Sequence, residues 1–239
     1  MIENTDKRLP QEVLKIIACI TMLIDHFGHA IVPCLSTTNM VDIYYTCRII
    51  GRMAFPIYCF LLVEGMYHTK NAGKYILRLA IGMLIAELPF DMLFEGHFCW
   101  ASQSVMVTLT LGAVMLWLMN KTENKLLQAV TTVPFALLAE LAKCDYGGWG
   151  IAMIAMFAII EQLPFQIMLL GAISVLMPSA KVAFGSMNIS VQMFSILGML
   201  PIYFYSGEKL TDSKAVQWAF YLFYPLHILI LWLVLQVLG

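Results

Sequence analysis

Residues 215–239 read AVQWAFYLFYPLHILILWLVLQVLG, a run of 25 residues without Asp, Glu, Lys or Arg. About 20 consecutive apolar residues form a helix that crosses the hydrocarbon core of a bilayer. Two further uncharged runs of 25 and 26 residues lie at 96–120 and 182–207, and 162–180 adds one of 19. Because these runs are continuously apolar rather than alternating, they predict membrane-spanning helices and not the strands of a membrane barrel.

The composition of the whole chain agrees with this prediction. Of its 239 residues, 61% are hydrophobic and 12% are charged, which is about half the charged share of a typical soluble domain. A chain this hydrophobic is not intrinsically disordered. A net charge of -1 gives no basic surface for nucleic acid. We therefore expect an all-α polytopic membrane protein.

Turn-forming residues divide the chain into about nine expected transmembrane helices. The connections are too short to hold a second domain, so we expect one transmembrane domain over residues 1–239, with a cytoplasmic lead at 1–12. The expected helices span about 13–34, 43–67, 74–94, 103–120, 126–142, 147–161, 164–178, 186–205 and 216–237.

Lysine and arginine set the expected orientation, because cytoplasmic loops carry an excess of both. With nine spans, ten of these residues fall on one side and two on the other. The ten are Lys7, Arg8, Lys15, Lys70, Lys74, Arg78, Lys121, Lys125, Lys209 and Lys214, and the two are Lys143 and Lys181. We predict a cytoplasmic amino terminus and, with nine spans, a carboxyl terminus outside.

Ionisable residues inside the expected spans are candidates for function, because a charge in the membrane is costly. Most of them lie in the first three spans and form pairs four residues apart, which share one helix face. The pairs are Asp25/His29, Arg48/Arg52, Glu64/His68 and Glu87/Asp91. In the last span, Tyr224 and His227 lie beside Pro225, which predicts a kinked helix that lines a cavity.

The rise of a helix gives the expected depth of these groups. At about 1.5 Å per residue, Asp25 and His26 lie past the midplane, and the alternating direction of the spans brings both arginines, Glu87 and Asp91 to the same outer half. The first helix also carries Lys15, eleven positions before His26 or about 16 Å lower. Such a helix suits a donor with anionic phosphates at the inner edge and a reactive group deep inside.

Two of these sets also have structural interpretations. Arg48 could pair with Glu87 or Asp91 in a buried ion pair that fixes helix packing, and the sequence favours this about equally with a contact to the substrate. Basic residues at the inner edge, taken singly, serve orientation or headgroup contact. A histidine next to a carboxylate in mid-helix, as in Asp25-His26, has no simple packing rationale.

The six cysteines are scattered and include no CxxC motif. We interpret them as small apolar residues that stay reduced, and we expect no metal site.

Several stretches resemble the TraX family. They are LKII at 14–17, LIDHFG at 23–28, RIIGRMAFPI at 48–57, FLLVEG at 60–65, HTKN at 68–71, ELPFD at 87–91 and FYLFYPLH at 220–227. The matches are dense over residues 12–95 and recur at 220–230. TraX-like proteins are associated with N-terminal acetylation of conjugative pilin, and the family looks related to the acyltransferase-type-3 transmembrane enzymes.

The resemblance implies an acyltransferase-type-3-like bundle in the bacterial cytoplasmic (inner) membrane, with acetyl-CoA taken from the cytoplasm as donor. In that wider class, a basic residue and a His with ten residues between them mark the first helix, which matches Lys15 and His26. An Arg-rich stretch after the second helix binds the donor there, and Lys74 and Arg78 occupy the comparable place. This chain departs by having Lys at the first position and a spacing of four rather than three.

The leading hypothesis is therefore a membrane acetyltransferase. His26 acts as general base on an amine or hydroxyl, and Asp25 orients it or raises its basicity. Arg48 and Arg52 stabilise an oxyanion or hold an anionic acceptor, in surroundings formed by Glu64, Glu87, Asp91, Tyr224 and His227. Lys15, Lys74 and Arg78 hold the phosphates of acetyl-CoA. The acceptor, a pilin N-terminus, a peptide or an envelope glycan, enters from the outer side. A homodimer is left open.

Two other classes remain. Buried Asp, His and Glu also form proton relays, which makes a proton-coupled transporter or flippase the first alternative. The chain shows no pair of interrupted segments in its two halves, as inverted-repeat transporters do. The second alternative is a non-catalytic assembly factor for a pilus or conjugation machine, which predicts tolerance to substitution of His26.

Overall fold

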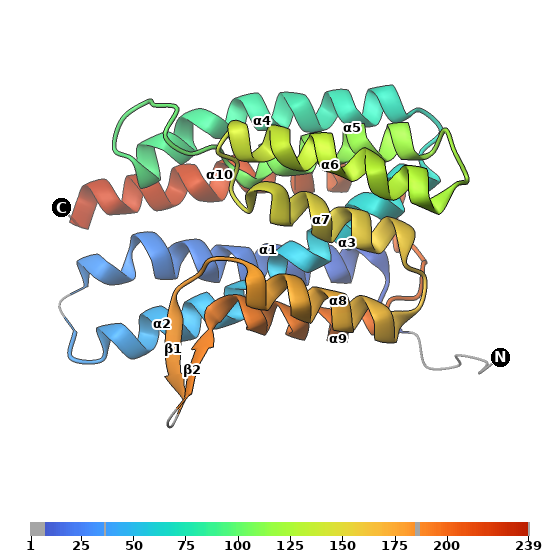
Figure 1. Cartoon of the computed structure of the whole chain (residues 1–239). Coiled ribbons are helices and arrows are strands. Elements are labelled where there is room, and N and C mark those ends of the chain that lie inside the picture. The colour runs from blue at the N-terminus through green and yellow to red at the C-terminus, as the bar shows by residue number, and fades with distance from the viewer. Residues whose placement is uncertain (1–7, 36, 185–186, 239) are drawn as a thin grey trace.

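The computed structural model describes residues 8–35, 37–184 and 187–238. Its helices lie side by side along one direction, so that the connecting loops gather at two ends (Figure 1). The α-helices are α1 (Gln11–Ala30), α2 (Met40–Gly51), α3 (Ala54–His68), α4 (Ala72–Phe94), α5 (Val105–Met119), α6 (Lys125–Leu141), α7 (Gly147–Ile159), α8 (Leu163–Leu176), α9 (Met199–Tyr203) and α10 (Lys214–Leu238). The 3-10 helices η1 (Val32–Cys34) and η2 (Val191–Gly198) and the strands β1 (Lys181–Phe184) and β2 (Met187–Ser190) complete the described elements.

One end of the bundle, which we call the basic end, holds the starts of α1, α4 and α10 (Figure 1). Here the backbone N–H of Gln11 donates to the carbonyl of Glu208 at 2.8 Å. The segment before α1 thereby lies against the loop that leads into α10. The lysines and arginines that the sequence assigns to one side lie at this end, except that Lys7 is outside the described residues.

The opposite end, which we call the hairpin end, holds the β1–β2 hairpin and the loops 95–104 and 142–146 (Figure 1). The backbone N–H of Gln103 donates to the carbonyl of Lys143 at 2.9 Å, and the N–H of Asp145 donates to the carbonyl of Gln103 at 2.8 Å. These bonds join the two loops across the end of the bundle and fix the position of residues 144–146.

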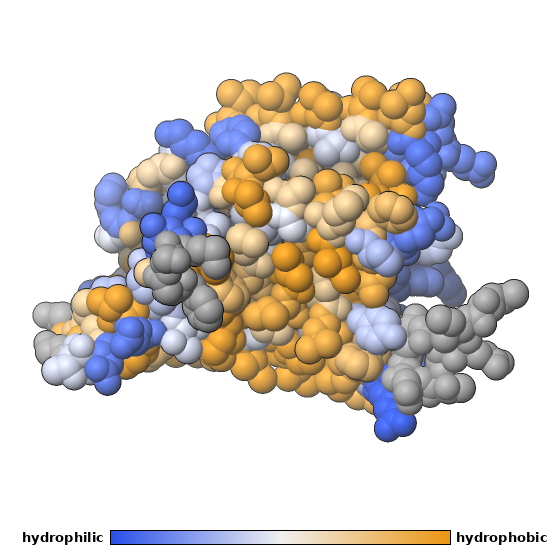
Figure 2. All heavy atoms as spheres, turned by 60° about the horizontal axis from the view of Figure 1, so that its bottom comes forward, coloured by the Kyte–Doolittle hydropathy of each residue, from blue (hydrophilic) through white to orange (hydrophobic). Residues whose placement is uncertain are grey.

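The outer surface of the bundle is apolar. Large side chains such as those of Leu84, Leu137 and Ile230 are more than half exposed. Figure 2 shows hydrophobic side chains over most of one face, with hydrophilic ones gathered toward its margins. Among the described residues, three helical stretches are long and apolar enough to cross a membrane, Gln11–Cys34, Met40–His68 and Lys214–Leu238, and four shorter apolar helices accompany them. This is the surface of a multi-pass membrane protein.

The stretch expected as one helix at 43–67 is broken. The structure divides it into α2 and α3, with a turn at Arg52 and Met53. Pro56 explains the break, because proline has no N–H for the carbonyl of Arg52 and its ring clashes with that carbonyl in a continuous helix. Gly51, the last residue of α2, lies so close to α1 that a Cβ there would overlap the carboxylate of Asp25.

The stretch expected as one helix at 186–205 is also different, and it gives the otherwise all-α chain its one described pair of strands. It consists of β2, η2 and α9, while residues 185 and 186 lie outside the described part. Strands β1 and β2 pair antiparallel, with Lys181 opposite Ser190. Pro201 interrupts the α-helical hydrogen bonds here, because it cannot donate to the carbonyl of Leu197. Gly198 packs closely on the turn before α3, where a Cβ would meet the carbonyl oxygen of Met53 at 2.9 Å.

Gly51→Ala tests the close packing of α1 and α2. The added methyl group meets Asp25, and overpacking of this kind costs about 1–3 kcal/mol. We expect a lower melting temperature of the purified protein in detergent. Gly171→Ala is the matched control, because its Cβ would find only an ordinary contact with Ile196 at 3.5 Å. An equal melting temperature for Gly51→Ala and wild type would contradict the packing described.

Candidate functional site

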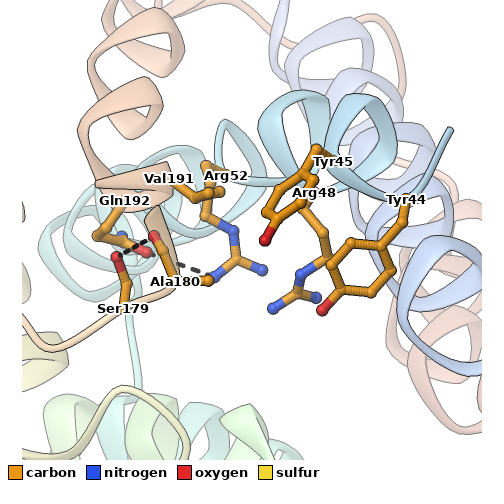
Figure 3. Close-up of a pocket in the computed structure, with 8 residues that line it drawn as sticks. All are labelled: Tyr44, Tyr45, Arg48, Arg52, Ser179, Ala180, Val191 and Gln192. Carbon is orange, nitrogen blue, oxygen red and sulfur yellow. Dashed lines mark hydrogen bonds between the residues drawn. The ribbon is translucent and has the colours of Figure 1, made fainter. Parts of the chain in front are cut away.

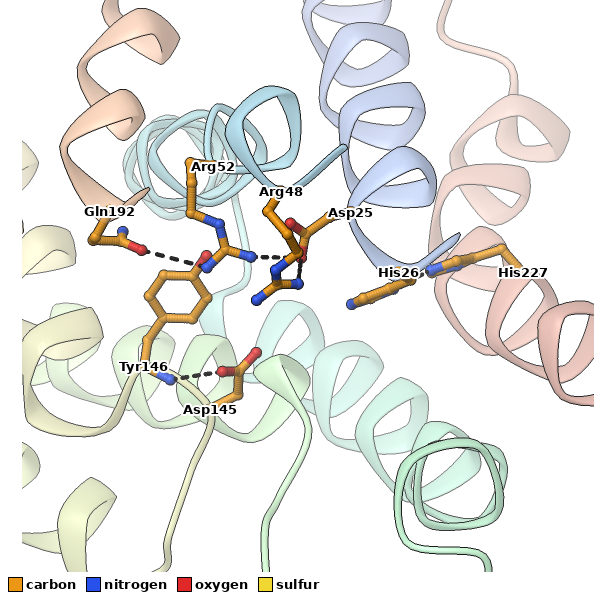
Figure 4. Close-up of polar contacts among 8 residues, drawn as sticks. All are labelled: Asp25, His26, Arg48, Arg52, Asp145, Tyr146, Gln192 and His227. Carbon is orange, nitrogen blue, oxygen red and sulfur yellow. Dashed lines mark hydrogen bonds and ion pairs between the residues drawn. The ribbon is translucent and has the colours of Figure 1, made fainter. Parts of the chain in front are cut away.

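Asp25 and His26 are consecutive residues of α1, and both are buried, with 6% and 8% of their surface exposed. Side chains of neighbouring residues on a helix point about 100° apart. Asp25 therefore faces α2, while His26 faces α10 (Figure 4). One turn of α1 thus serves two different groups of partners.

The carboxylate of Asp25 accepts hydrogen bonds from two arginines. Nη1 of Arg48 lies 2.7 Å and Nη2 of Arg52 lies 2.5 Å from the same oxygen, Oδ2 (Figure 4). The other oxygen, Oδ1, is buried and has no hydrogen-bond partner among the described residues. Nη1 of Arg52 also donates to Oε1 of Gln192 at 3.3 Å. Arg48 lies in the last turn of α2 and Arg52 directly after that helix, and this spacing lets both reach one carboxylate.

His26 pairs with His227 of α10. Its Nδ1 lies 2.8 Å from Nε2 of His227, and the planes of the two rings differ by 4°. Nδ1 of His227 lies 2.9 Å from the carbonyl oxygen of Phe223, which can only accept. With both rings neutral, His227 therefore carries its proton on Nδ1 and accepts at Nε2 from the Nδ1–H of His26.

This chain of hydrogen bonds fixes the tautomer of His26. Because Nδ1 donates, Nε2 keeps its lone pair and can take a proton. Nε2 points away from His227, toward the side on which Arg48 lies (Figure 4). The ring of Tyr224 lies edge-on to His26, at 6.1 Å between centroids, and holds the imidazole in place. The arrangement is that of a general base whose second nitrogen is held by a positioning group.

Two pockets meet at the Asp25–arginine contact. The inner pocket is lined by Asp25, His26, Tyr58, Asp145 and Tyr146, together with apolar residues of α1, α3 and α5. The outer pocket opens at the hairpin end and is lined by Tyr44, Tyr45, Arg48, Arg52, Ser179, Ala180, Val191 and Gln192 (Figure 3). Asp25 and its two arginines form the wall between them.

The sequence patterns did not single out Asp145, Tyr146 and Gln192. The ring of Tyr146 lies 5.8 Å from the guanidinium of Arg52, and Asp145 lies beside it in the inner pocket (Figure 4). Tyr146 has φ 65°, which is uncommon for a residue other than glycine. Polar residues before the Gly147-Gly148 pair suggest an ordinary solvated turn, so the sequence carries little signal for this part of the site.

Three carboxylates lie away from His26. Oε1 of Glu87 accepts from Oγ of Ser104 at 2.5 Å, and Oδ2 of Asp91 accepts from the N–H of Cys99 at 3.2 Å. Both therefore anchor the loop after α4. Glu64 lies toward the basic end, 3.5 Å from the exposed His68. The structural ion pair of Arg48 with Glu87 or Asp91 is not formed, because α2 packs on α1, where Asp25 is nearer.

The basic residues of the expected donor site lie near the start of α10. Nζ of Lys15 lies 5.3 Å from the ring of Phe220, and the guanidinium of Arg78 lies 5.8 Å from the ring of Tyr221. Two consecutive residues of α10 thus bring Lys15 and Arg78 to one region. Lys74 is exposed one turn earlier in α4. His227 follows Phe220 by seven residues, about 10 Å along the helix.

The sequence model of one protein family, described as "TraX protein", matches residues 10–235. The chain belongs to the TraX family. A curated relative from Dichelobacter nodosus, named "Probable fimbrial assembly protein FimC, serogroup H1", is 30% identical over 231 residues, which cover 91% of this chain and 92% of that protein. No solved structure matches. The family resemblance of the sequence motifs is thereby confirmed, and the TraX match contains every residue of the site.

The TraX chain has no cluster of three or more His, Cys, Asp or Glu residues that could hold a metal, within the residues that the structure describes. The six cysteines are free thiols. Burial raises the pKa of Cys144, in the loop after α6, to about 11, so this thiol is protonated at neutral pH.

Asp25→Asn tests the central ion pair. The substitution leaves two partly buried guanidiniums, 21% and 12% exposed, without their paired carboxylate, and breaking a fully buried pair costs about 3–5 kcal/mol. We expect a large drop in melting temperature, whereas Asp42→Asn, on the exposed face of α2, changes it little. Adding Arg48→Gln to Asp25→Asn removes one unpaired charge and is expected to recover part of the loss. A double variant less stable than Asp25→Asn alone would refute the pairing.

Proposed function

We propose that this TraX protein is an integral membrane acetyltransferase that moves an acetyl group from acetyl-CoA to an amine or hydroxyl of an acceptor. The observation that carries the proposal is the buried His26, whose Nε2 is free to accept a proton while its Nδ1 is held by His227 at 2.8 Å. Membership of a family associated with pilin acetylation supports the same reaction. A relation of the bundle to acyltransferase-type-3 enzymes is part of this proposal.

His26 and the acceptor carry out the transfer. Nε2 of His26 takes the proton of the acceptor as its nitrogen or oxygen attacks the carbonyl carbon of the thioester. The tetrahedral intermediate then collapses, the carbon–sulfur bond breaks, and the proton passes from His26 to the departing thiolate of CoA. Asp25, the residue before His26, is fixed by Arg48 and Arg52 and holds this turn of α1 in place.

The donor is proposed to bind from the basic end. Lys15, Lys74 and Arg78 supply cations for its phosphates, and Phe220 and Tyr221 supply flat surfaces beside them. We place this end in the cytoplasm, where acetyl-CoA is available, because it carries the excess of lysine and arginine. The protein then lies in the bacterial cytoplasmic membrane, and the acceptor is a pilin N-terminus, a peptide or an envelope glycan that reaches the site from outside.

The name of the Dichelobacter relative favours a second candidate, a non-catalytic factor in fimbrial assembly. Such a factor needs neither a free imidazole nitrogen nor turnover of acetyl-CoA. The two candidates therefore separate on the effect of substitutions at His26.

His26→Ala removes the proposed base. General-base catalysis contributes about 10²–10⁴-fold to a rate, so we expect release of CoA from acetyl-CoA by the purified protein to fall by about that factor. His68→Ala is the matched control, because His68 is exposed at the basic end. The elution profile and melting temperature show whether the variant folds. Full turnover by well-folded His26→Ala would refute the catalytic assignment.

His227 is tested as a positioning residue by two substitutions. Gln offers an acceptor oxygen for the Nδ1–H of His26, whereas Leu offers none. We expect His227→Leu to lower kcat by about 10²-fold or more, since loss of the group that fixes a base's tautomer costs up to about 10⁴-fold, with little change in KM. His227→Gln is expected to recover part of the rate. Equal kcat values for the two variants would show that His227 acts only through packing.

A further inference from the structure

The outer pocket carries an excess of positive charge. Arg48 and Arg52 both line it, and none of its eight lining residues is acidic. Asp25 and Asp145, the carboxylates closest to the arginines, line the inner pocket instead. The side chain of Arg48 is 21% exposed, so part of its guanidinium is open to the pocket (Figure 3).

Hydrogen-bond donors are also in excess. Each guanidinium has five N–H groups, yet the two arginines share one oxygen of Asp25, and Arg52 alone has a second acceptor, Oε1 of Gln192. Nε2 of Gln192, a fully buried side chain, has no partner among the described residues, and neither has Nε of Arg52. Buried donors without acceptors are costly. A group with several acceptor oxygens in the pocket would satisfy these donors.

We propose that the outer pocket binds an oxyanion, a carboxylate or phosphate group, of the acceptor molecule. This inference rests on the acetyl transfer proposed above and names the acceptor's chemistry. Guanidinium groups bind carboxylates and phosphates through paired hydrogen bonds, and the hydroxyls of Tyr44, Tyr45 and Ser179 line the rim of the pocket.

The position of the pocket suits an acceptor and not the donor. Its lining residues come from α2, residues 179–180 and the start of η2, next to the β1–β2 hairpin, whereas Lys15 and Arg78 lie against Phe220 and Tyr221 near the start of α10. Its two arginines are bonded to Asp25, which lines the neighbouring pocket together with His26. An acceptor held by its anionic group in the outer pocket can thus extend its amine or hydroxyl past these paired side chains to His26.

Anion binding is measured without catalysis. Purified protein in dodecyl maltoside is saturated with CoA, and its melting temperature is followed with inorganic phosphate, glycerol 1-phosphate or glutarate at constant ionic strength. A ligand that binds the folded state raises the melting temperature with its concentration. The stronger response to a phosphate or to the dicarboxylate identifies the class of anion, and a response to glycerol 1-phosphate above that to phosphate indicates a lipid headgroup.

Three variants decide the result. We expect Arg48→Gln to abolish the shift, and Arg48→Lys, which keeps the charge next to Asp25 but loses the fork, to weaken binding about tenfold. Lys181→Gln, an exposed cation in β1 at the same end, should leave the shift unchanged. No shift with any anion, a shift retained in Arg48→Gln, or a preference for the lipid headgroup would overturn the proposal. A shift caused by CoA itself reports on the donor site, so failure of the acceptor pocket and failure of the acetyltransferase proposal are distinguishable.

Discussion

The carboxylate of Asp25 is the constraint on which the structure depends. It lies in the middle of an apolar helix, where an unpaired charge is not tolerated. Two arginines four residues apart reach one of its oxygens only because Gly51 lets α2 approach α1 closely and because the chain turns before Pro56. Gln192 and Tyr146 then pack on Arg52. The break at Pro56 thereby serves a single buried charge, around which segments far apart in the sequence come together.

Helix α1 presents the side chains of the site in different directions. Its basic end presents Lys15 to α10, and one face of its later turns presents Asp25 to α2 while the next presents His26 to His227. The proposed reaction uses these directions, with donor, base and acceptor each approached from a different side of one helix. Helix α10 is the counterpart, since Phe220, Tyr221, Tyr224 and His227 all contact this region.

Much of the candidate site is local in sequence and could be predicted. Asp25, His26, Arg48 and Arg52 stand out because ionisable residues are rare in apolar spans, and helical rise places them at one depth. Depth does not give the direction in which a side chain points, however, so Glu87 and Asp91 were expected beside the arginines, whereas α4 directs them to the loop before α5. Hydropathy also does not distinguish an α-helix from an apolar strand followed by a 3-10 helix, so β2 and η2 were not predicted within an uncharged run. The contact of His26 with His227 joins the first and last helices, and no periodicity in a single sequence encodes such a pairing.

The ring of His227 is held by the carbonyl of Phe223 within its own helix, so its orientation is set as soon as α10 forms. His26, in contrast, gains its partner His227 only when α10 has formed, and α10 follows every other described helix in the chain. A chain interrupted before α10 already contains Asp25, both arginines and α1–α9, but the nitrogen that fixes the tautomer of His26 is absent. The order of the helices in the chain thus makes synthesis of α10 a condition for the contact between His26 and His227.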